Sequence, residues 1–192
     1  MTLRAFIAVD PSDEVVRRLA ETIRSLERKT TGFRWVRPEA IHLTLRFLGE
    51  IEESLIDEID RRLGQLVGSH EPISLSAAGL GFFPGPEKPR VVWAGLEGQT
   101  ERLAGLQKDV QAQMKDLSVH KEEDRSFTPH LTLARIPHFR GASGISSILQ
   151  AAPEARFGEF VVDRLLLYKS RLTPEGASYT KLREYKLRVN EA

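Results

Sequence analysis

One tetrapeptide, His-Leu-Thr-Leu, occurs twice in this chain, at residues 42–45 and at residues 130–133. Each copy alternates polar and apolar residues, which is the pattern of a β-strand with one buried face, because residues i and i+2 of a strand share a face. The leucines would then enter a core, and the histidine and threonine would stand side by side on the opposite face. Each half of the 192-residue chain carries one copy. Two histidine–threonine pairs can therefore face each other across a groove.

The composition excludes some classes of chemistry. The chain has no cysteine, which rules out disulfides, thiolate catalysis and cysteine-held zinc or iron–sulfur centres. The formal net charge is only +1, so contact with a nucleic acid has to come from a local basic patch. The apolar run at residues 3–9 is too short for a signal peptide, and no segment reaches the length of a membrane span. We therefore expect a cytoplasmic protein without membrane contact.

Hydrophobic periodicity predicts an α+β protein. Apolar spacings of three and four indicate helices at residues 13–28, 52–67 and 100–117, with strands between and after them. Several strands follow one another through short turns, which favours antiparallel pairing. The order of elements in the first half is loosely repeated in the second. We therefore expect residues 1–192 to form a single bilobal domain, with two pseudo-symmetric lobes of antiparallel sheet flanked by helices and a central cleft.

Three local predictions concern segments outside the repeat. Residues 157–169 are expected to form one long central strand, and residues 118–127 a polar loop. Residues 79–89 are rich in glycine and proline and are expected to form a loop. The adjacent aromatic residues Phe82 and Phe83 would lie in that loop as a small core or as an exposed platform, and the core is favoured.

A histidine–threonine pair has interpretations other than acid–base catalysis. A lone histidine on a strand usually does no more than hydrogen-bond a neighbour, but a structural role does not require the same polar arrangement twice. Two histidines could bind zinc, yet neither motif has a carboxylate at a neighbouring ligand position. Threonine could be a nucleophile with histidine as its base, but no third, orienting group is evident.

Displacement at a phosphorus atom suits two such pairs best. One neutral histidine would take a proton from an attacking water, and the other, protonated, would give a proton to the leaving oxygen; each role is worth about 10²–10⁴-fold. The two threonine hydroxyls would donate to the non-bridging oxygens, where charge accumulates. His42 and His130 are thus the predicted catalytic residues, and Thr44 and Thr132 are predicted to bind substrate. This chemistry needs no metal and no other cofactor.

The flanks of both motifs are similar to those of a known superfamily. Residues 34–50, RWVRPEAIHLTLRFLGE, and residues 127–135, FTPHLTLAR, resemble the 2H phosphoesterases, and specifically the RNA 2′,3′-cyclic phosphodiesterases, also called 2′-5′ RNA ligases. The similarity runs from RAFIAV at residues 4–9, through RVVWAG at residues 90–95, to the last pair of strands near Tyr179. It covers essentially the whole chain. A doubled H-x-T with these flanks is specific, whereas a single copy would not be.

The resemblance implies a bilobal α+β fold with both motifs in the cleft. It also implies hydrolysis of a terminal 2′,3′-cyclic phosphate of RNA to a 2′-phosphate without metal or ATP, with His42 as the acid toward the 3′ oxygen and His130 as the base for water. The reverse reaction would join a cyclic phosphate end to a 5′-hydroxyl through a 2′-5′ linkage. The expected partner is RNA with a 2′,3′-cyclic phosphate end, and the expected state is a monomer. A non-catalytic module for RNA ends and a 2H phosphoesterase for a small cyclic nucleotide stay open as alternatives.

Three more positions are predicted to contact substrate. Arg135 lies five residues after His130, where the family has an arginine able to reach the phosphate, and a guanidinium matches two phosphate oxygens. Phe47, five residues after His42, would stack on the terminal base, although alternation puts it on the leucine face unless the strand bulges. Arg46 shares the His42 face by alternation and would contact a backbone phosphate. Further basic residues could extend the rim but are more simply interpreted as solvated charges: Arg34, Arg37, Lys88 and Arg90.

Overall fold

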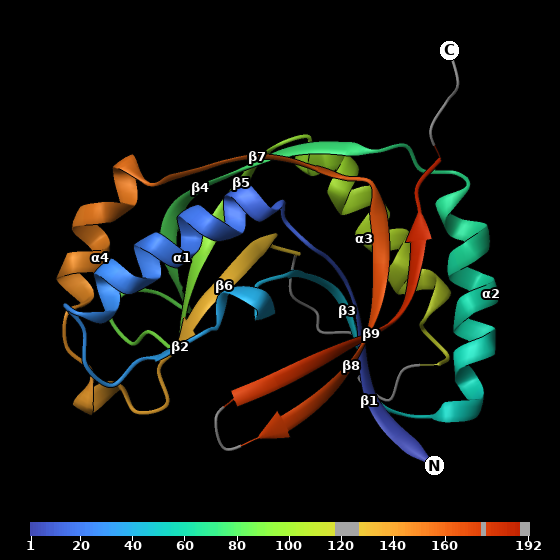
Figure 1. The fold of residues 1–192 in the computed structure, drawn as a ribbon, viewed down its shortest axis with the longest axis horizontal. Helices are drawn as coiled ribbons and strands as arrows, with labels where there is room; N and C mark the ends of the chain where they lie inside the picture. The colour runs from blue at the N-terminus through green and yellow to red at the C-terminus, as the bar shows by residue number, and fades with distance from the viewer. Residues whose placement is uncertain (118–126, 174–175, 189–192) are drawn as a thin grey trace.

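The computed structural model describes residues 1–117, 127–173 and 176–188. Within these ranges the strands form two antiparallel sheets, which make up two lobes side by side (Figure 1). The first lobe holds a four-stranded sheet in the order β3-β1-β8-β9. Its strands are β1 (Thr2–Val9), β3 (Leu43–Glu52), β8 (Arg164–Thr173) and β9 (Gly176–Lys186). The α+β, two-lobed architecture expected from the sequence is confirmed.

The second lobe holds a five-stranded sheet in the order β2-β6-β5-β4-β7. Its strands are β2 (Arg34–Trp35), β4 (Ile73–Phe83), β5 (Val91–Gly98), β6 (His130–Arg135) and β7 (Arg156–Val162). Each lobe thus contains one copy of the repeated tetrapeptide, in β3 and in β6. Elements from both halves of the chain build each lobe, since the early β1 pairs with the late β8, and β4 pairs with β7.

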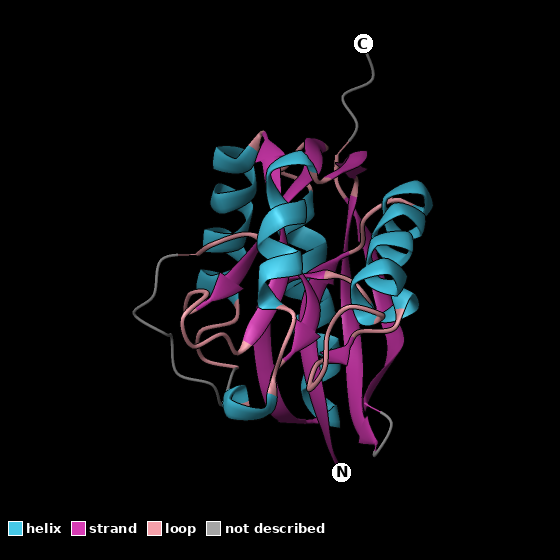
Figure 2. Ribbon diagram, turned by 90° about the vertical axis from the view of Figure 1, so that its left-hand side faces the viewer, coloured by secondary structure: helices cyan, strands magenta, loops and turns pink. Residues whose placement is uncertain are grey.

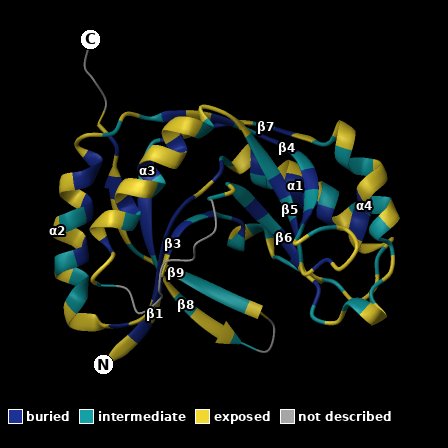
Figure 3. Ribbon diagram, turned by 180° about the vertical axis from the view of Figure 1, so that it is seen from behind, coloured by how far each residue is buried: buried dark blue, intermediate teal, exposed yellow. Residues whose placement is uncertain are grey.

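The four helices of the described residues cover the outer faces of the sheets (Figure 2). In the first lobe α2 (Ile56–Val67) packs on β9 and on α3 (Thr100–Gln113), and α3 packs on β3. In the second lobe α1 (Asp13–Glu27) packs on β7, and α4 (Ile145–Ala151) packs on β4. The helices expose their outer sides and bury the sides toward the sheets (Figure 3). None of these helices combines the length and apolar character needed to cross a membrane.

Helix α1 illustrates how the sequence specifies these elements. The Ser12 hydroxyl accepts a hydrogen bond from the amide of Val15 (3.4 Å), which caps the helix, and two acidic residues follow in the first turn. An apolar stripe at helical spacing then faces the second sheet: Val15, Leu19, Ile23 and Leu26 are all buried. Burial of these apolar side chains stabilises the packing of α1 on the second sheet, whose strands all come later in the sequence.

Two of the local predictions are wrong. The expected single strand at 157–169 is two strands, because the chain leaves the second sheet at Asp163 and continues as β8 in the first. The expected loop at 79–89 is ordered strand up to Phe83: Gly79 adopts a positive φ (70°) at a register shift between β4 and β5, so it forms a bulge and does not end the strand. The polar loop expected at 118–127 falls almost wholly outside the described residues.

Candidate active site

The two tetrapeptide strands share an irregularity that determines which side chains face the cleft. In β3 the pairing with β1 shifts register between Thr44 and Arg46, and in β6 the pairing with β5 shifts between Thr132 and Ala134. In both motifs the extra residue is the second leucine. A β-bulge of this kind puts two residues of one strand opposite one of its partner and inverts the alternation beyond it.

The bulges bring the fifth residue after each histidine onto the histidine–threonine face. In β6, Arg135, Thr132 and His130 lie opposite Val91, Trp93 and Gly95, which are alternate residues on one face of β5. In β3, Thr44 and Phe47 lie opposite Ala8 and Phe6, again alternate residues of β1. The structure therefore brings His42, Thr44 and Phe47 to one face of β3, and His130, Thr132 and Arg135 to one face of β6.

Arg46 does not join this group. The bulge turns it to the opposite face, where it pairs with the core residue Ile7 and is only 6% exposed. The expectation that it shares the face of His42 and Thr44 is wrong, because it assumed regular alternation through Leu45. The same bulge leaves Phe47 45% exposed beside Phe6, with ring centroids 5.8 Å apart. Regular alternation would have buried it.

Both imidazoles are held in the same way. The Nδ1–H of His42 donates to the carbonyl of Ala40 (2.8 Å), and the Nδ1–H of His130 donates to the carbonyl of Thr128 (2.8 Å). A carbonyl oxygen only accepts, so the ring proton of each neutral histidine is on Nδ1 and the lone pair is on Nε2. Each Nε2 can take a proton as a base or give one as an acid. Neither the carbonyls nor this symmetry was evident from the motif alone.

His42 is enclosed by aromatic rings. The ring of Phe6 lies 4.7 Å from the imidazole centroid, Tyr179 meets it edge-on at 5.0 Å, and Tyr168 lies at 6.4 Å. The pKa of His42 is lowered from 6.5 to about 4, mainly by burial. The hydrogen bond to Ala40 opposes this shift, and the charges of Arg135 and His130 add to it. Strands β3 and β6 contact each other, and the charges of Arg135 and His130 reach His42, so the two tetrapeptide strands meet.

His130 has a more open environment. Among the rings of the described residues only Phe83 contacts it, edge-on at 4.8 Å, and Phe83 in turn packs on Trp93 at 5.2 Å. Burial also lowers the pKa of His130, and Arg135 acts in the same direction. Trp93 lies flat on the second sheet because Gly81 has no side chain; a Cβ there would come within 2.2 Å of the indole. Phe82, the neighbour of Phe83, is buried in the core, as the favoured alternative predicted, whereas Phe83 is half-buried between Trp93 and His130.

Four aromatic residues of the site were missed by sequence reasoning or left unassigned: Phe6, Phe83, Tyr168 and Tyr179. Phe6 and the two tyrosines come from β1, β8 and β9, far from the motifs in sequence, and only the sheet register brings them together. The hydroxyl of Tyr168 donates to Asp10 (2.6 Å), which fixes the ring that stacks on Phe6 at 5.3 Å. The tetrapeptides themselves give no signal for such neighbours.

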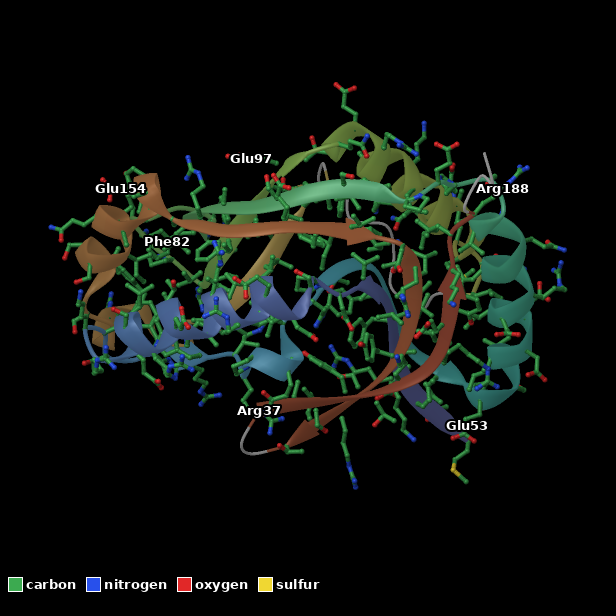
Figure 4. The ribbon with its side chains drawn as sticks, turned by 45° about the horizontal axis from the view of Figure 1, so that its top comes forward. Arg37, Glu53, Phe82, Glu97, Glu154 and Arg188 are labelled. Carbon is green, nitrogen blue, oxygen red and sulfur yellow. The ribbon has the colours of Figure 1, made fainter. Side chains whose placement is uncertain are left out.

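The β8–β9 hairpin leaves the first lobe and runs toward the segment that joins β2 to β3 (Figure 1). The guanidinium of Arg37 donates to the carbonyl of Ala177 on the hairpin (3.3 Å), and Figure 4 shows Arg37 beside it. Arg37 thus links the segment before β3 to the hairpin through this hydrogen bond. No group of three or more His, Asp and Glu side chains suited to a metal ion occurs in the described part of the chain.

Comparison with known proteins agrees with this architecture. Residues 9–93 and 95–179 each match the family described as LigT like phosphoesterase, so the two halves match it separately. An Archaeoglobus fulgidus protein named RNA 2′,3′-cyclic phosphodiesterase is 35% identical over 185 residues, which are 95% of this chain and 99% of that protein. A Thermotoga maritima protein of the same name is 34% identical over 183 residues, 95% and 94% of the two chains.

Solved structures share the fold. The crystal structure of TT0787 of Thermus thermophilus superposes with a TM-score of 0.79 at 30% identity and covers 98% of this chain and 100% of its own. Escherichia coli LigT complexed with 3′-AMP has the same fold with a TM-score of 0.75 at 22% identity, covering 97% and 99%. Two lobes that each present a histidine–threonine strand define a two-histidine phosphoesterase. The chain belongs to the LigT like phosphoesterase family, which confirms the resemblance inferred from its motifs.

Proposed function

We propose that this phosphoesterase hydrolyses the terminal 2′,3′-cyclic phosphate of RNA to a 2′-phosphate by acid–base catalysis with His42 and His130. The observation that carries the proposal is the matched pair of Nδ1–H bonds to the carbonyls of Ala40 and Thr128, which leaves both Nε2 atoms for proton transfer. The relatives named RNA 2′,3′-cyclic phosphodiesterase support the choice of substrate.

The reaction is an exchange of two oxygens at phosphorus. His130 Nε2 takes a proton from water, the water oxygen bonds to phosphorus, and the bond from phosphorus to the 3′ oxygen breaks. His42, protonated on Nε2, gives its proton to that 3′ oxygen, so the product has a 3′-hydroxyl and a 2′-phosphate. His130 then carries the extra proton, and solvent restores both rings.

Thr44, Thr132 and Arg135 would stabilise the charge that grows on the non-bridging oxygens. The threonines flank the histidines on the same face, and Arg135 acts electrostatically on both rings. Phe47, exposed beside Phe6, would stack on the terminal base. Arg46, buried on the opposite face of β3, has no part in this set.

The phosphate itself would complete the proton balance. In the free protein burial favours neutral imidazoles, most strongly at His42. An anionic phosphodiester between the rings favours the protonated form, so its binding raises both pKa values. His42 could then enter the reaction as the cation. With a 5′-hydroxyl in place of water as the nucleophile, the same displacement of the 3′ oxygen would join the two RNA ends through a 2′-5′ linkage.

The site would be complete in one chain, because a single copy supplies both histidine–threonine pairs. We therefore propose a monomer that uses no metal or other cofactor. The absence of cysteine fits the reducing cytoplasm, where we place its action.

The test is incubation of an oligonucleotide that ends in a 2′,3′-cyclic phosphate, in excess EDTA, with identification of the phosphate position in the product. We expect a 2′-phosphate at an unchanged rate in EDTA. A 3′-phosphate would contradict the leaving group, and loss of the rate in EDTA would point to a metal. Binding without turnover would favour a non-catalytic module for RNA ends. Faster turnover of a small cyclic nucleotide than of any RNA end would favour a phosphoesterase for small cyclic nucleotides.

A further inference from the structure

We propose that Arg34 and Arg135 together form a second anion subsite, which takes the internucleotide phosphate next to the terminal cyclic phosphate. This inference rests on the proposed function, and it goes beyond it by making the enzyme prefer a polynucleotide end to a mononucleotide. Arg34 lies in the short edge strand β2, outside both tetrapeptides.

The sheet register places the two arginines directly opposite each other. Arg34 pairs with Arg135, Trp35 pairs with Ala134, and the amide of Val36 donates to the carbonyl of Leu133 (2.8 Å). Directly opposed residues of an antiparallel pair have Cβ atoms about 4.5–5.5 Å apart and share a face. β2 lies along the C-terminal end of β6, as Figure 1 also shows.

The shared face is the one that carries the active site. Arg135 lies on the face of Thr132 and His130. The alternation of β2 agrees, because Phe33 and Trp35 stack on each other at 5.7 Å and pack against the core, which turns Arg34 to the cleft side. The charge of Arg135 reaches His42, His130 and Tyr179. Arg34 therefore adds a second cation to the edge of the proposed active site.

Within the described ranges this arginine pair lacks a neutralising partner. Like charges directly opposite each other in a sheet destabilise it. Both side chains are exposed, and no carboxylate of those ranges lies within ion-pair distance of either guanidinium. Other arginines on the outer surface are paired, such as Arg17 with Glu14 and Arg62 with Glu58. A bound anion would relieve the repulsion between the two guanidinium groups and accept hydrogen bonds from both.

Single-stranded RNA supplies such an anion at each linkage. The terminal phosphate would occupy the space between His42 and His130. Arg135 lies several residues along β6 from His130, at about 3.3 Å per residue, and Arg34 lies one strand further across the sheet. A substrate of two or more nucleotides can therefore place its next phosphate at the arginine pair, whereas a mononucleotide has none to place there.

The experiment compares a dinucleotide and a mononucleotide, both ending in a 2′,3′-cyclic phosphate, on wild type and Arg34→Gln. We expect the variant to lose about five- to tenfold in kcat/KM on the dinucleotide, as for one lost charge-assisted contact, with the mononucleotide unchanged within about twofold. The dependence of log kcat/KM on log salt for the dinucleotide should become shallower by about 0.7, the slope for one phosphate contact to a single strand.

Arg24→Gln is the matched control. Arg24 is exposed on α1 on the outer side of the same lobe, and its loss removes the same charge without touching the cleft. We expect it to leave the ratio of the two substrates unchanged. The melting temperature gives a second readout, since a purely structural Arg34 would lower it on replacement, whereas relief of repulsion leaves it unchanged or raises it.

The outcomes separate this inference from the proposed function. Equal losses on both substrates, or an unchanged ratio in Arg34→Gln, would overturn the subsite while hydrolysis itself stands. If wild type cleaves neither substrate, the proposed function fails and the subsite fails with it. A dinucleotide-specific loss in Arg34→Gln alone, with no fall in melting temperature, supports the arginine pair.

Discussion

The two histidines occupy equivalent backbone frames but different surroundings. Each begins the same tetrapeptide, donates through Nδ1 to the carbonyl two residues earlier and is followed by a bulge at the second leucine. His42, however, packs against Phe6 and Tyr179, whereas His130 meets only Phe83 among the rings that the structure describes. Pseudo-symmetry of the backbone thus supplies two groups with the same geometry, and the side chains from other strands set their pKa values apart.

In the free protein this difference runs against the proposed roles, because the ring whose pKa is lowered more strongly is His42, the proposed acid. One ring has to be neutral while the other is charged, so a bound anionic phosphate has to raise the pKa of His42 more than that of His130. The identical sequences of the two motifs cannot produce such a difference. Substitutions at the histidines have the largest expected effect, and substitutions of their neighbours have smaller ones.

Replacement of either histidine by alanine should lower kcat/KM by about 10²–10⁴-fold, the usual contribution of one general acid or base. The pH profiles of the residual activity separate the roles. Without the base, the limb that rises with pH disappears; without the acid, the limb that falls with pH disappears. We expect His130→Ala to lose the rising limb and His42→Ala the falling limb. The reverse pattern would exchange the roles, and unchanged activity in either variant would contradict the mechanism.

Cavities in the two lobes test whether the lobes form one folding unit. Leu19 of α1 and Leu63 of α2 are fully buried, one in each lobe. Each replacement by alanine should lower the free energy of unfolding by about 2–5 kcal/mol. Because the chain crosses between the sheets at Asp163 and β1 pairs with β8, we expect a single transition to shift in both variants. Two resolved transitions in a calorimetric scan, each sensitive to one variant, would contradict the single bilobal domain.

Gly81→Ala tests the support of His130. The new Cβ would lie 2.2 Å from the indole of Trp93. The indole therefore has to move from its present position, where it lies opposite Thr132 and packs on Phe83. We expect kcat/KM to fall by about ten- to a hundredfold, as when a catalytic group is misplaced by about 1 Å.

The control for this change is Gly64→Ala. Gly64 lies in α2, and a Cβ added there would meet no atom within 4 Å. Alanine at this position should raise the free energy of unfolding by about 0.5–1 kcal/mol and leave kcat/KM alone. Unchanged activity in Gly81→Ala would show that the position of Trp93 does not matter to His130.

The sequence was a good guide to what depends on local pattern. Alternation located both histidine–threonine strands, and helical spacing located α1, α2 and α3. The errors arose where tertiary pairing overrides local pattern. A bulge buries Arg46 and exposes Phe47, and a continuous apolar run at 157–169 serves two sheets because both β7 and β8 need buried residues. The aromatic residues around His42 come from three strands, so no window of sequence could have grouped them.

The aromatic neighbours themselves give the last and smallest effect. If burial by rings lowers the pKa of His42, Tyr179→Ala should admit water and raise that pKa from about 4 toward 6.5, by about one unit if roughly 1.4 kcal/mol of desolvation is relieved. The pKa of His130 should stay where it is, because Tyr179 does not contact that ring among the aromatic pairs of the described residues. Phe83→Ala should raise the pKa of His130 and leave that of His42 unchanged. NMR titration of the two imidazoles in the free protein measures both values.

Since a higher pKa moves the corresponding limb of the kcat/KM profile to higher pH, each variant should displace one limb only. Equal displacement of both pKa values by either change would mean that the shared charge of Arg135, and not the separate aromatic surroundings, distinguishes the two histidines from histidines in water.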